Sequence, residues 1–390
     1  MRRGAGTGWI GMLTAFALFA AVVFVAGCGG DDDSGGGAAT DSGAQATSES
    51  SALVEDARAA AEAASKWPTE WQGPTKPTKA QPGKKIVAIS CSQATACAQE
   101  VEGIVDGGKA IGWDVQVVDG KGDPAVYTSA IRNAVTSGAD GIVLASINVG
   151  LVADALRFAK EHDVPVINNA SITAKQAGID PSLVAADNPD PNAERGTNMA
   201  NWMIADSGGK AKVVLFRTQD AGLNERDDAI VARLKECPDC TILEEINAGF
   251  DVTTTPKMTQ QINSLLDKYG NDLQYIVTPY SAADTFAVPA LQSRGRDDVK
   301  ILNSSPTEQQ VKLCSEGKYI GAAYGDDLVW VGWEAIDALN RALEDPKAEQ
   351  PDQNTVWVML TKETCPASGN FSENNPVDYK AKFRELWGVG

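Results

Sequence analysis

The sequence has 390 residues, of which 43% are hydrophobic and 22% charged, and its formal net charge is −18 at pH 7. At roughly 150 residues per domain, this length predicts two domains with substantial cores. The 52 acidic residues outnumber the 34 basic ones, so the surface should repel phosphate backbones, and we expect no nucleic-acid partner. His162 is the only histidine, which argues against most metal sites and against histidine-based catalysis. Composition therefore argues against an enzyme, and we expect no metal and no cofactor.

The N-terminus has the pattern of an export signal. Two arginines precede an apolar run, residues 10–26, which has the order and length of a signal peptide. The run ends in Val25-Ala26-Gly27-Cys28, which resembles the lipobox of bacterial lipoproteins, where the cysteine receives a diacylglyceryl group and the signal is cut before it. A plain transmembrane anchor is the alternative, but the run is short for a span. The sequence predicts a signal peptide over 1–27 and lipidation of Cys28, which would hold the protein outside the bacterial cell membrane.

Six cysteines remain after the lipidated one, and an even number in an exported protein favours disulfides over free thiols. Many pairings are open in principle, and we expect Cys91–Cys97, Cys237–Cys240 and Cys314–Cys365, the first two because they are neighbours. The pair at 237 and 240 has the spacing of a redox motif. However, redox pairs of the thioredoxin type open a helix, whereas this pair follows a predicted helix, so a structural role is favoured.

Residues 29–50 are almost wholly small or polar, which is typical of a flexible chain. A helical stretch over 51–67 and a proline-containing spacer over 68–84 follow. We therefore expect residues 28–83 to form a lipidated flexible tether, and the folded body to begin near Lys84.

From Lys84 onward, short runs rich in Val, Ile and Ala alternate with helical segments. Strands are predicted over 85–91, 113–118, 141–146, 165–168 and 183–187, and again over 212–216, 241–246, 273–278, 300–303 and 319–324. Such runs separated by helices are typical of parallel sheets covered on both faces. The sequence predicts an α/β fold with two doubly wound parallel-sheet (Rossmann-like) domains, in which ligands bind outside the carboxyl ends of the strands.

The order of these elements resembles the type 1 periplasmic binding proteins, in particular the sugar receptors of ABC transporters typified by ribose-binding protein. The segments that carry the resemblance are residues 85–89, 119–124, 139–142, 187–188, 250–251 and 383–388. Each motif alone is weak, but they are collinear over about three hundred residues. The resemblance implies a type I fold with a three-strand hinge near Asn188, Gly325 and Pro346. It assigns 84–188 plus 326–346 to the N-terminal lobe and 189–325 plus 347–390 to the C-terminal lobe.

The resemblance also implies a set of ligand-binding positions. These are Ser92, Gln93, Asn168, Asn169, Arg226, Phe250, Tyr280, Asn303 and Asp326. Asn168 and Asn169 replace the Asp-Arg pair of sugar binders, and the loop at Ser92 lacks the family's paired phenylalanines. Several positions have a structural alternative: Phe250 and Tyr280 in a core, Arg226 paired with an adjacent aspartate, Asn303 as a helix cap and Asp326 bonded to the hinge backbone.

Amide and hydroxyl groups at these positions suggest a neutral, hydroxyl-bearing ligand such as a sugar, polyol or nucleoside. The resemblance implies an extracytoplasmic solute-binding lipoprotein of an ABC importer, monomeric, that closes around its ligand by hinge motion and is recognised by a membrane permease. A lipoprotein that senses a ligand and signals to a membrane receptor kinase uses the same chemistry and is the alternative. A hydrolase would need a Gly-x-Ser-x-Gly elbow followed by a histidine, which the sequence lacks.

Overall fold

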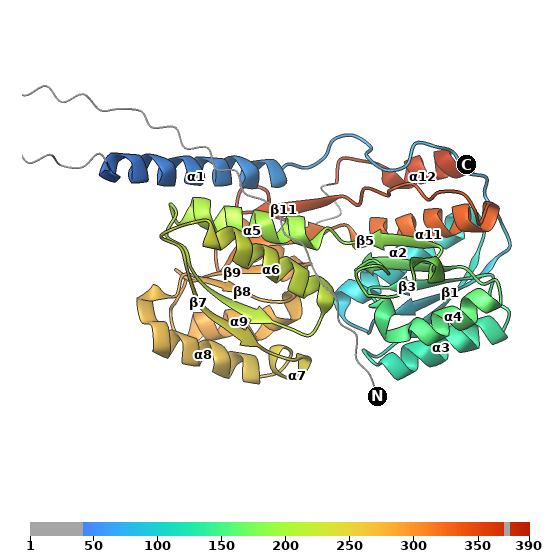
Figure 1. Cartoon of the computed structure of the whole chain (residues 1–390), viewed down its shortest axis with the longest axis horizontal. Coiled ribbons are helices and arrows are strands. Elements are labelled where there is room, and N and C mark those ends of the chain that lie inside the picture. The colour runs from blue at the N-terminus through green and yellow to red at the C-terminus, as the bar shows by residue number, and fades with distance from the viewer. Residues whose placement is uncertain (1–41, 370–374) are drawn as a thin grey trace, which may run out of the picture. The chain divides into compact units, whose positions relative to one another are not determined.

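A computed structural model describes residues 42–369 and 375–390 (Figure 1). The predicted signal peptide, the lipidation site Cys28 and the first part of the predicted tether lie outside the described residues. Within them, the chain forms one parallel sheet and a second sheet that is parallel except for one edge strand, each with helices on both faces, as the alternation of strands and helices predicts. The predicted α/β fold class is confirmed.

The first lobe contains a five-stranded parallel sheet in the order β2-β1-β3-β4-β5. Its strands are β1 (Lys85–Ser90), β2 (Asp114–Asp119), β3 (Gly141–Ala145), β4 (Val166–Ser171) and β5 (Ala186–Pro189). Its helices are α2 (Thr95–Ile111), α3 (Pro124–Thr136), α4 (Ala153–Glu161) and α11 (Leu328–Glu344), with short 3₁₀ turns η1 (Val149–Val152) and η2 (Pro181–Leu183). Every residue of β3 is buried, because helices cover both faces of the sheet.

The second lobe contains a six-stranded sheet in the order β11-β10-β9-β8-β6-β7. Its strands are β6 (Lys212–Arg217), β7 (Thr241–Asn247), β8 (Tyr275–Val277), β9 (Lys300–Ser304), β10 (Ile320–Asp326) and β11 (Trp357–Thr361). Its helices are α5 (Asn192–Asp206), α6 (Ala221–Lys235), α7 (Phe250–Thr253), α8 (Lys257–Tyr269), α9 (Ser281–Ser293) and α10 (Glu308–Ser315), with the 3₁₀ turn η3 (Gly270–Asp272). Only β11 runs antiparallel to its neighbour, and it lies at the edge of the sheet.

The segment expected to be a flexible tether is instead packed on the body, and this part of the prediction is wrong. We call residues 42–83 the strap. Its helix α1 (Ser42–Ala64) buries Ala57 and Ala61 in the core of the second lobe, and Trp71 stacks on Trp330 of the first lobe. The strap is rich in alanine, proline and polar residues, a composition typical of flexible segments. Nevertheless, a narrow stripe of small residues on α1 and the side chains of Trp67 and Trp71 pack against the body.

The assignment of residues 347–390 wholly to the second lobe is also wrong. β11 joins the second sheet, but the last helix, α12 (Tyr379–Trp387), packs in the core of the first lobe. Trp387 stacks on Trp333 of α11 with ring centroids 5.4 Å apart, and its indole nitrogen donates to Asp337 at 2.8 Å. The aromatic face of α12 fits the tryptophans of α11, and this burial draws the C-terminus back to the first lobe.

Helices α2 and α11 approach so closely that glycines form their contact. A Cβ atom at Gly332 would lie 2.4 Å from the carbonyl oxygen of Glu100, whereas one at Gly107 would meet only side-chain carbons, at 3.2 Å or more. We expect Gly332→Ala to force the backbones apart and to reduce the free energy of unfolding by about 1–3 kcal/mol. Urea denaturation measures this, with Gly107→Ala as the matched control. Equal losses in the two variants would contradict the tight backbone contact.

The structure contains three disulfides, Cys91–Cys97, Cys237–Cys240 and Cys314–Cys365, which is the pairing that the sequence suggests. The pair at 237 and 240 lies between the end of α6 and the start of β7, so it does not open a helix. Among the described residues, no helix is long and apolar enough to cross a bilayer, and no three metal-ligating side chains cluster together.

Candidate ligand-binding site

The predicted site residues come from both sheets, and most lie at or just beyond the carboxyl ends of strands. Ser92 and Gln93 follow β1, Asn168 and Asn169 lie in β4, Phe250 opens α7 after β7, Tyr280 follows β8, Asn303 lies in β9, Asp326 ends β10, and Arg226 lies in α6. In parallel sheets these strand ends share one edge, where ligands bind. Their side chains nevertheless differ sharply in how accessible they are.

Phe250 and Tyr280 form an aromatic pair on the second lobe. Phe250 is 63% exposed, which is unusual for a large apolar side chain, and its ring centroid lies 5.4 Å from that of Tyr280. The Tyr280 hydroxyl is hydrogen-bonded to the hydroxyl of Thr253, which fixes the orientation of the tyrosine. An exposed, oriented aromatic ring at a strand end is suited to pack against the apolar face of a sugar or a base.

Arg226 is fully buried, and its five N–H groups are all used within the protein. Nε and Nη2 donate to Asp227 Oδ1 at 3.0 and 2.7 Å. Nη1 donates to the Pro279 carbonyl at 3.1 Å and to Ser304 Oγ at 2.8 Å, and Nη2 also donates to the Thr278 carbonyl at 3.3 Å. The guanidinium therefore ties together the ends of β8 and β9. In this structure it has no donor left for a ligand, and the adjacent aspartate is its ion-pair partner.

Asn303 belongs to a buried network with Asp284. Its Nδ2 donates to one carboxylate oxygen of Asp284, and Thr278 Oγ1 donates to the other at 2.7 Å. Burial raises the pKa of Asp284 to about 7, although these hydrogen bonds favour the charged form. Asn303 does not cap the next helix, because Thr307 and Gln310 form a capping box at the start of α10.

Asn169 is the centre of a buried network in the first lobe. Its Nδ2 donates to Glu100 Oε1 at 2.7 Å, and its Oδ1 accepts from Asn188 Nδ2 at 3.0 Å. Ser146 Oγ donates to the other oxygen of Glu100 at 2.6 Å. Burial raises the pKa of Glu100 to about 8, although the hydrogen bonds from Ser146 and Asn169 oppose that rise. The amide of Asn169 thus joins β4, β5 and α2 to one another.

Asn168 is also fully buried, and its Nδ2 donates to the Ile172 carbonyl at 2.8 Å and to Asp187 Oδ1 at 2.7 Å. The loop after β1 is different, because Gln93 is exposed and Ser92 is only partly buried. The Cys91–Cys97 disulfide closes this loop, and Ser92 Oγ accepts from the backbone N–H of Ala94 at 3.1 Å. In the first lobe, therefore, this loop offers accessible polar groups and the two asparagines do not.

Asp326 lies in an ion pair with Arg195 at the hinge. Arg195 Nη2 lies 2.5 Å from Asp326 Oδ1 and 3.2 Å from Asp190 Oδ1, and both Arg195 and Asp326 are almost fully buried. Burial raises the pKa of Asp326 to about 6, while the guanidinium opposes that rise. Asp190 follows β5 and Asp326 ends β10, so Arg195 connects two of the crossovers between the lobes. Asp326 is thus held at the hinge by the side chain of Arg195, and not by the hinge backbone as the structural alternative had it.

Glu100, Arg195 and Asp284 were not predicted as site residues, although the sequence carries a signal for them. Each is a charged residue on the apolar stripe of a helix, as Glu100 is beside Val101 and Ile104 on α2. Charged side chains at such positions are rarely buried unless they are paired. A charge at a core position of the helical pattern therefore indicates a buried network.

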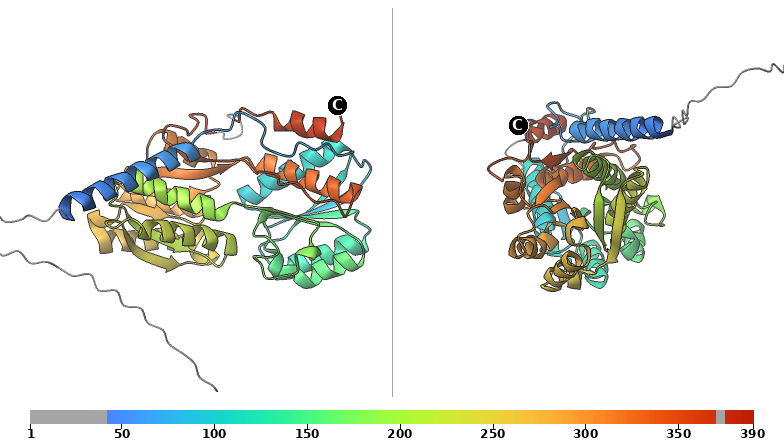
Figure 2. Two further views of the ribbon diagram at one scale, coloured as in Figure 1. Left: turned by 45° about the horizontal axis from the view of Figure 1, so that its top comes forward. Right: turned by 90° about the vertical axis from the view of Figure 1, so that its left-hand side faces the viewer.

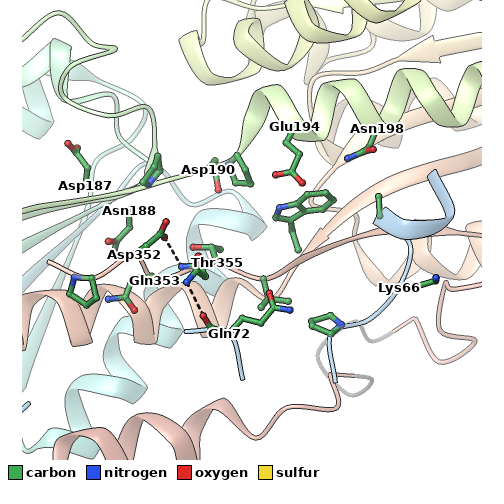
Figure 3. Close-up of a pocket in the computed structure, with 18 of the residues that line it drawn as sticks. Lys66, Gln72, Asp187, Asn188, Asp190, Glu194, Asn198, Asp352, Gln353 and Thr355 are labelled. Atoms are coloured by element: carbon green, nitrogen blue, oxygen red, sulfur yellow. Dashed lines mark hydrogen bonds between the residues drawn. The ribbon is translucent and has the colours of Figure 1, made fainter. Parts of the chain in front are cut away.

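A cavity of about 1120 Å³ lies where the strap passes the crossovers (Figure 3). Two tryptophans, Trp67 and Trp357, line it, together with Asp187, Asp190, Glu194 and Asp352. Three of these carboxylates have partners within the protein: Asn168 for Asp187, Arg195 for Asp190, and the backbone N–H of Asn354 for Asp352. None of the predicted ligand-binding residues lines this cavity.

Two parallel sheets joined at a hinge, with accessible aromatic and polar groups at their strand ends, define a two-lobed ligand-binding protein. A family model described as "Periplasmic binding protein domain" matches residues 87–347. The chain belongs to this family. A search of curated protein sequences finds no match.

Several solved structures share the fold. An ABC transporter solute-binding protein from Agrobacterium vitis with bound allitol is 19% identical, with a TM-score of 0.63, covering 73% of this chain and 97% of that one. A galactofuranose-binding protein is 18% identical, with a TM-score of 0.65, covering 76% and 100%. A periplasmic ribose ABC transporter protein from Conexibacter woesei is 19% identical, with a TM-score of 0.63, covering 74% and 95%. The family and these neighbours are extracytoplasmic solute-binding proteins and not enzymes.

Proposed function

We propose that this protein is the solute-binding lipoprotein of an ABC importer. It captures a small, neutral, hydroxyl-bearing ligand between its lobes by hinge closure and presents the closed form to a membrane permease. The observation that carries the proposal is the exposed ring of Phe250, paired with the half-buried ring of Tyr280 at the strand ends of the second lobe. The lipobox-like sequence before Cys28 supports attachment to the membrane by lipid.

The state of the charged residues supports a neutral ligand. All N–H groups of the Arg226 side chain donate to Asp227 or to the ends of β8 and β9, and Asp326 is paired with Arg195. A charged ligand would have to break one of these buried pairs and leave a charge uncompensated, which is costly. Hydroxyl groups need only the accessible donors and acceptors of Ser92 and Gln93. The allitol bound to the Agrobacterium vitis protein is a ligand of this chemical kind.

We expect Phe250→Ala to weaken binding by about tenfold, or about 1.4 kcal/mol, because the ligand loses its aromatic contact. The melting temperature of the unliganded protein should not change, since this ring is mostly exposed. A thermal-shift screen of the mature chain against monosaccharides, polyols and nucleosides first identifies a ligand, because one at 1,000 times its Kd contributes about 4 kcal/mol. Titration calorimetry then compares the variant with the wild type.

Val117→Ala is the matched control, since Val117 is also exposed but lies within β2 at the edge of the sheet. Equal ligand affinities of the Phe250→Ala and Val117→Ala variants would show that the aromatic pair is not part of the binding site. A screen in which no compound of the three classes shifts the melting temperature would overturn the proposed ligand class.

A further inference from the structure

The strap is bound to the first lobe by a buried polar side chain. Asn340 of α11 is fully buried, and its Nδ2 donates to Thr78 Oγ1 and to the Lys79 carbonyl, both at 3.1 Å. Its Oδ1 accepts from the backbone N–H of Gln81 at 3.0 Å. One amide therefore satisfies three groups of the strap, and a segment held in this way is part of the folded lobe.

An aromatic contact holds the strap on the same lobe nearer the crossing. The ring of Trp71 lies parallel to that of Trp330, with centroids 5.6 Å apart and planes 2° apart. The ring of Phe383 from α12 meets Trp71 edge-on at 5.0 Å. Stacked and edge-on contacts of this kind add to the burial of the rings. Trp71 therefore fixes the point at which the strap reaches the first lobe.

The other end of the strap is packed on the second lobe. Ala57 is fully buried and Ala61 is 5% exposed, in a cluster with Met199 and Met203 of α5. Figure 2 shows α1 (blue) lying across the second lobe. Residues four apart share one face of a helix, so these alanines form the contact stripe, while Ala59 on another face is exposed.

The few residues between these two ends run beside the crossovers of the hinge. Asn354, which precedes β11, donates through Nδ2 to the Gln72 carbonyl at 2.9 Å. Lys66, Trp67 and Pro68 line the cavity in Figure 3, and the crossover residues around Asn188 line the same cavity. The strap thus passes from lobe to lobe at the hinge itself.

We propose that the strap is an additional connection across the hinge, which limits how far the two lobes separate. From Ala64, the end of α1, to Trp71 the chain can span about 25 Å when fully extended. A larger separation of the two docking surfaces requires one end of the strap to detach. The strap therefore restricts the range of opening before any ligand binds. This inference goes beyond ligand capture and does not depend on the identity of the ligand.

The test lengthens the crossing while it leaves both docking surfaces intact. Six Gly-Ser residues are inserted between Thr69 and Glu70, which are both exposed, in the full mature chain. Nitroxide labels at Ser129→Cys in α3 and Gln261→Cys in α8, also exposed positions, report the distance between lobes by double electron–electron resonance. The insertion adds up to about 20 Å of reach. We expect a broader distance distribution shifted to longer distances in the unliganded protein, and a larger shift with twelve inserted residues.

The same insertion after Gly138, in an exposed turn of the first lobe, is the control and should not change the distribution. Two variants detach one end each. Ala57→Glu frees α1, with Ala59→Glu as the matched control on the exposed face of α1. Trp71→Ala combined with Asn340→Ala frees the first-lobe end, because the hydrogen bonds of Asn340 would otherwise still hold residues 78–81. These two variants should broaden the distribution alike, and combining them should add little, because releasing one end already breaks the connection. Identical distributions in the Thr69–Glu70 insertion and the Gly138 insertion would overturn the proposal. The measurement needs no ligand, so its failure is distinct from failure of the proposed import function.

Discussion

Replacing Glu100 with glutamine should stabilise the protein at pH 8 and have little effect at pH 5. Burial raises the pKa of this carboxyl from 4.5 to about 8, against the opposing effect of hydrogen bonds from Ser146 and Asn169, and the nearby carboxylate of Asp190 adds to the rise. Because the folded-state pKa lies above the unfolded one, the folded protein binds more protons between these values, and its stability falls as pH rises through this window. The glutamine amide can still accept from Asn169 and donate to Ser146.

A rise in pKa of this size corresponds to roughly 3 kcal/mol at pH 7 and about 5 kcal/mol above pH 8. Urea denaturation at pH 5, 6, 7 and 8 measures the effect, with Glu102→Gln, on the exposed face of the same helix, as the control. The Glu100→Gln variant keeps some of the pH dependence of the wild type, since burial also raises the pKa of Asp284 and Asp326. Parallel stability curves for the wild type and Glu100→Gln would show that Glu100 titrates normally.

Removing the Cys314–Cys365 disulfide by a double alanine substitution should reduce the free energy of unfolding by about 4 kcal/mol. The bond joins α10 to the segment after β11 across a sequence separation of 51 residues, and cross-linking a long loop removes much entropy from the unfolded chain. Denaturant unfolding under oxidising conditions measures the loss. The control is the Cys237–Cys240 pair, whose separation of 3 residues predicts a loss of roughly 2 kcal/mol. Equal losses would contradict the dependence on loop length.

The central strands could be predicted closely because they are buried on both faces. The predicted strands over 85–91 and 141–146 correspond to β1 and β3, whose apolar runs are bounded by glycine and polar residues. The strap could not be predicted, since its docking depends on tertiary contacts. Alanine at positions 57 and 61 gives a weak pattern, and Trp71 finds its partner Trp330 at the far end of the chain.

The location of the candidate site residues near the strand ends could be predicted from the sequence. The accessibility of their side chains could not. The amide of Asn169 is occupied by Glu100, which is 69 residues away in the chain, and Asp326 is paired with Arg195 across 131 residues. Such partners cannot be read from spacing. Arg226 is the exception, because its partner Asp227 is adjacent in the sequence and was a stated alternative. Phe250 could be a core residue or an exposed one by its pattern, and only the fold distinguishes the two.

The docked strap also shortens the linker that would join the body to the membrane. With Cys28 acylated as proposed, a linker from Cys28 to Lys84 could extend to roughly 190 Å. A linker from Cys28 to Ser42, where α1 begins, reaches about 50 Å at most. The volume that the body explores falls with the cube of that reach, so its effective concentration near the bilayer rises by more than an order of magnitude. A short linker keeps the ligand-bound protein close to membrane proteins. Ala57, Ala61 and Trp71 shorten the linker because they dock the strap on the body.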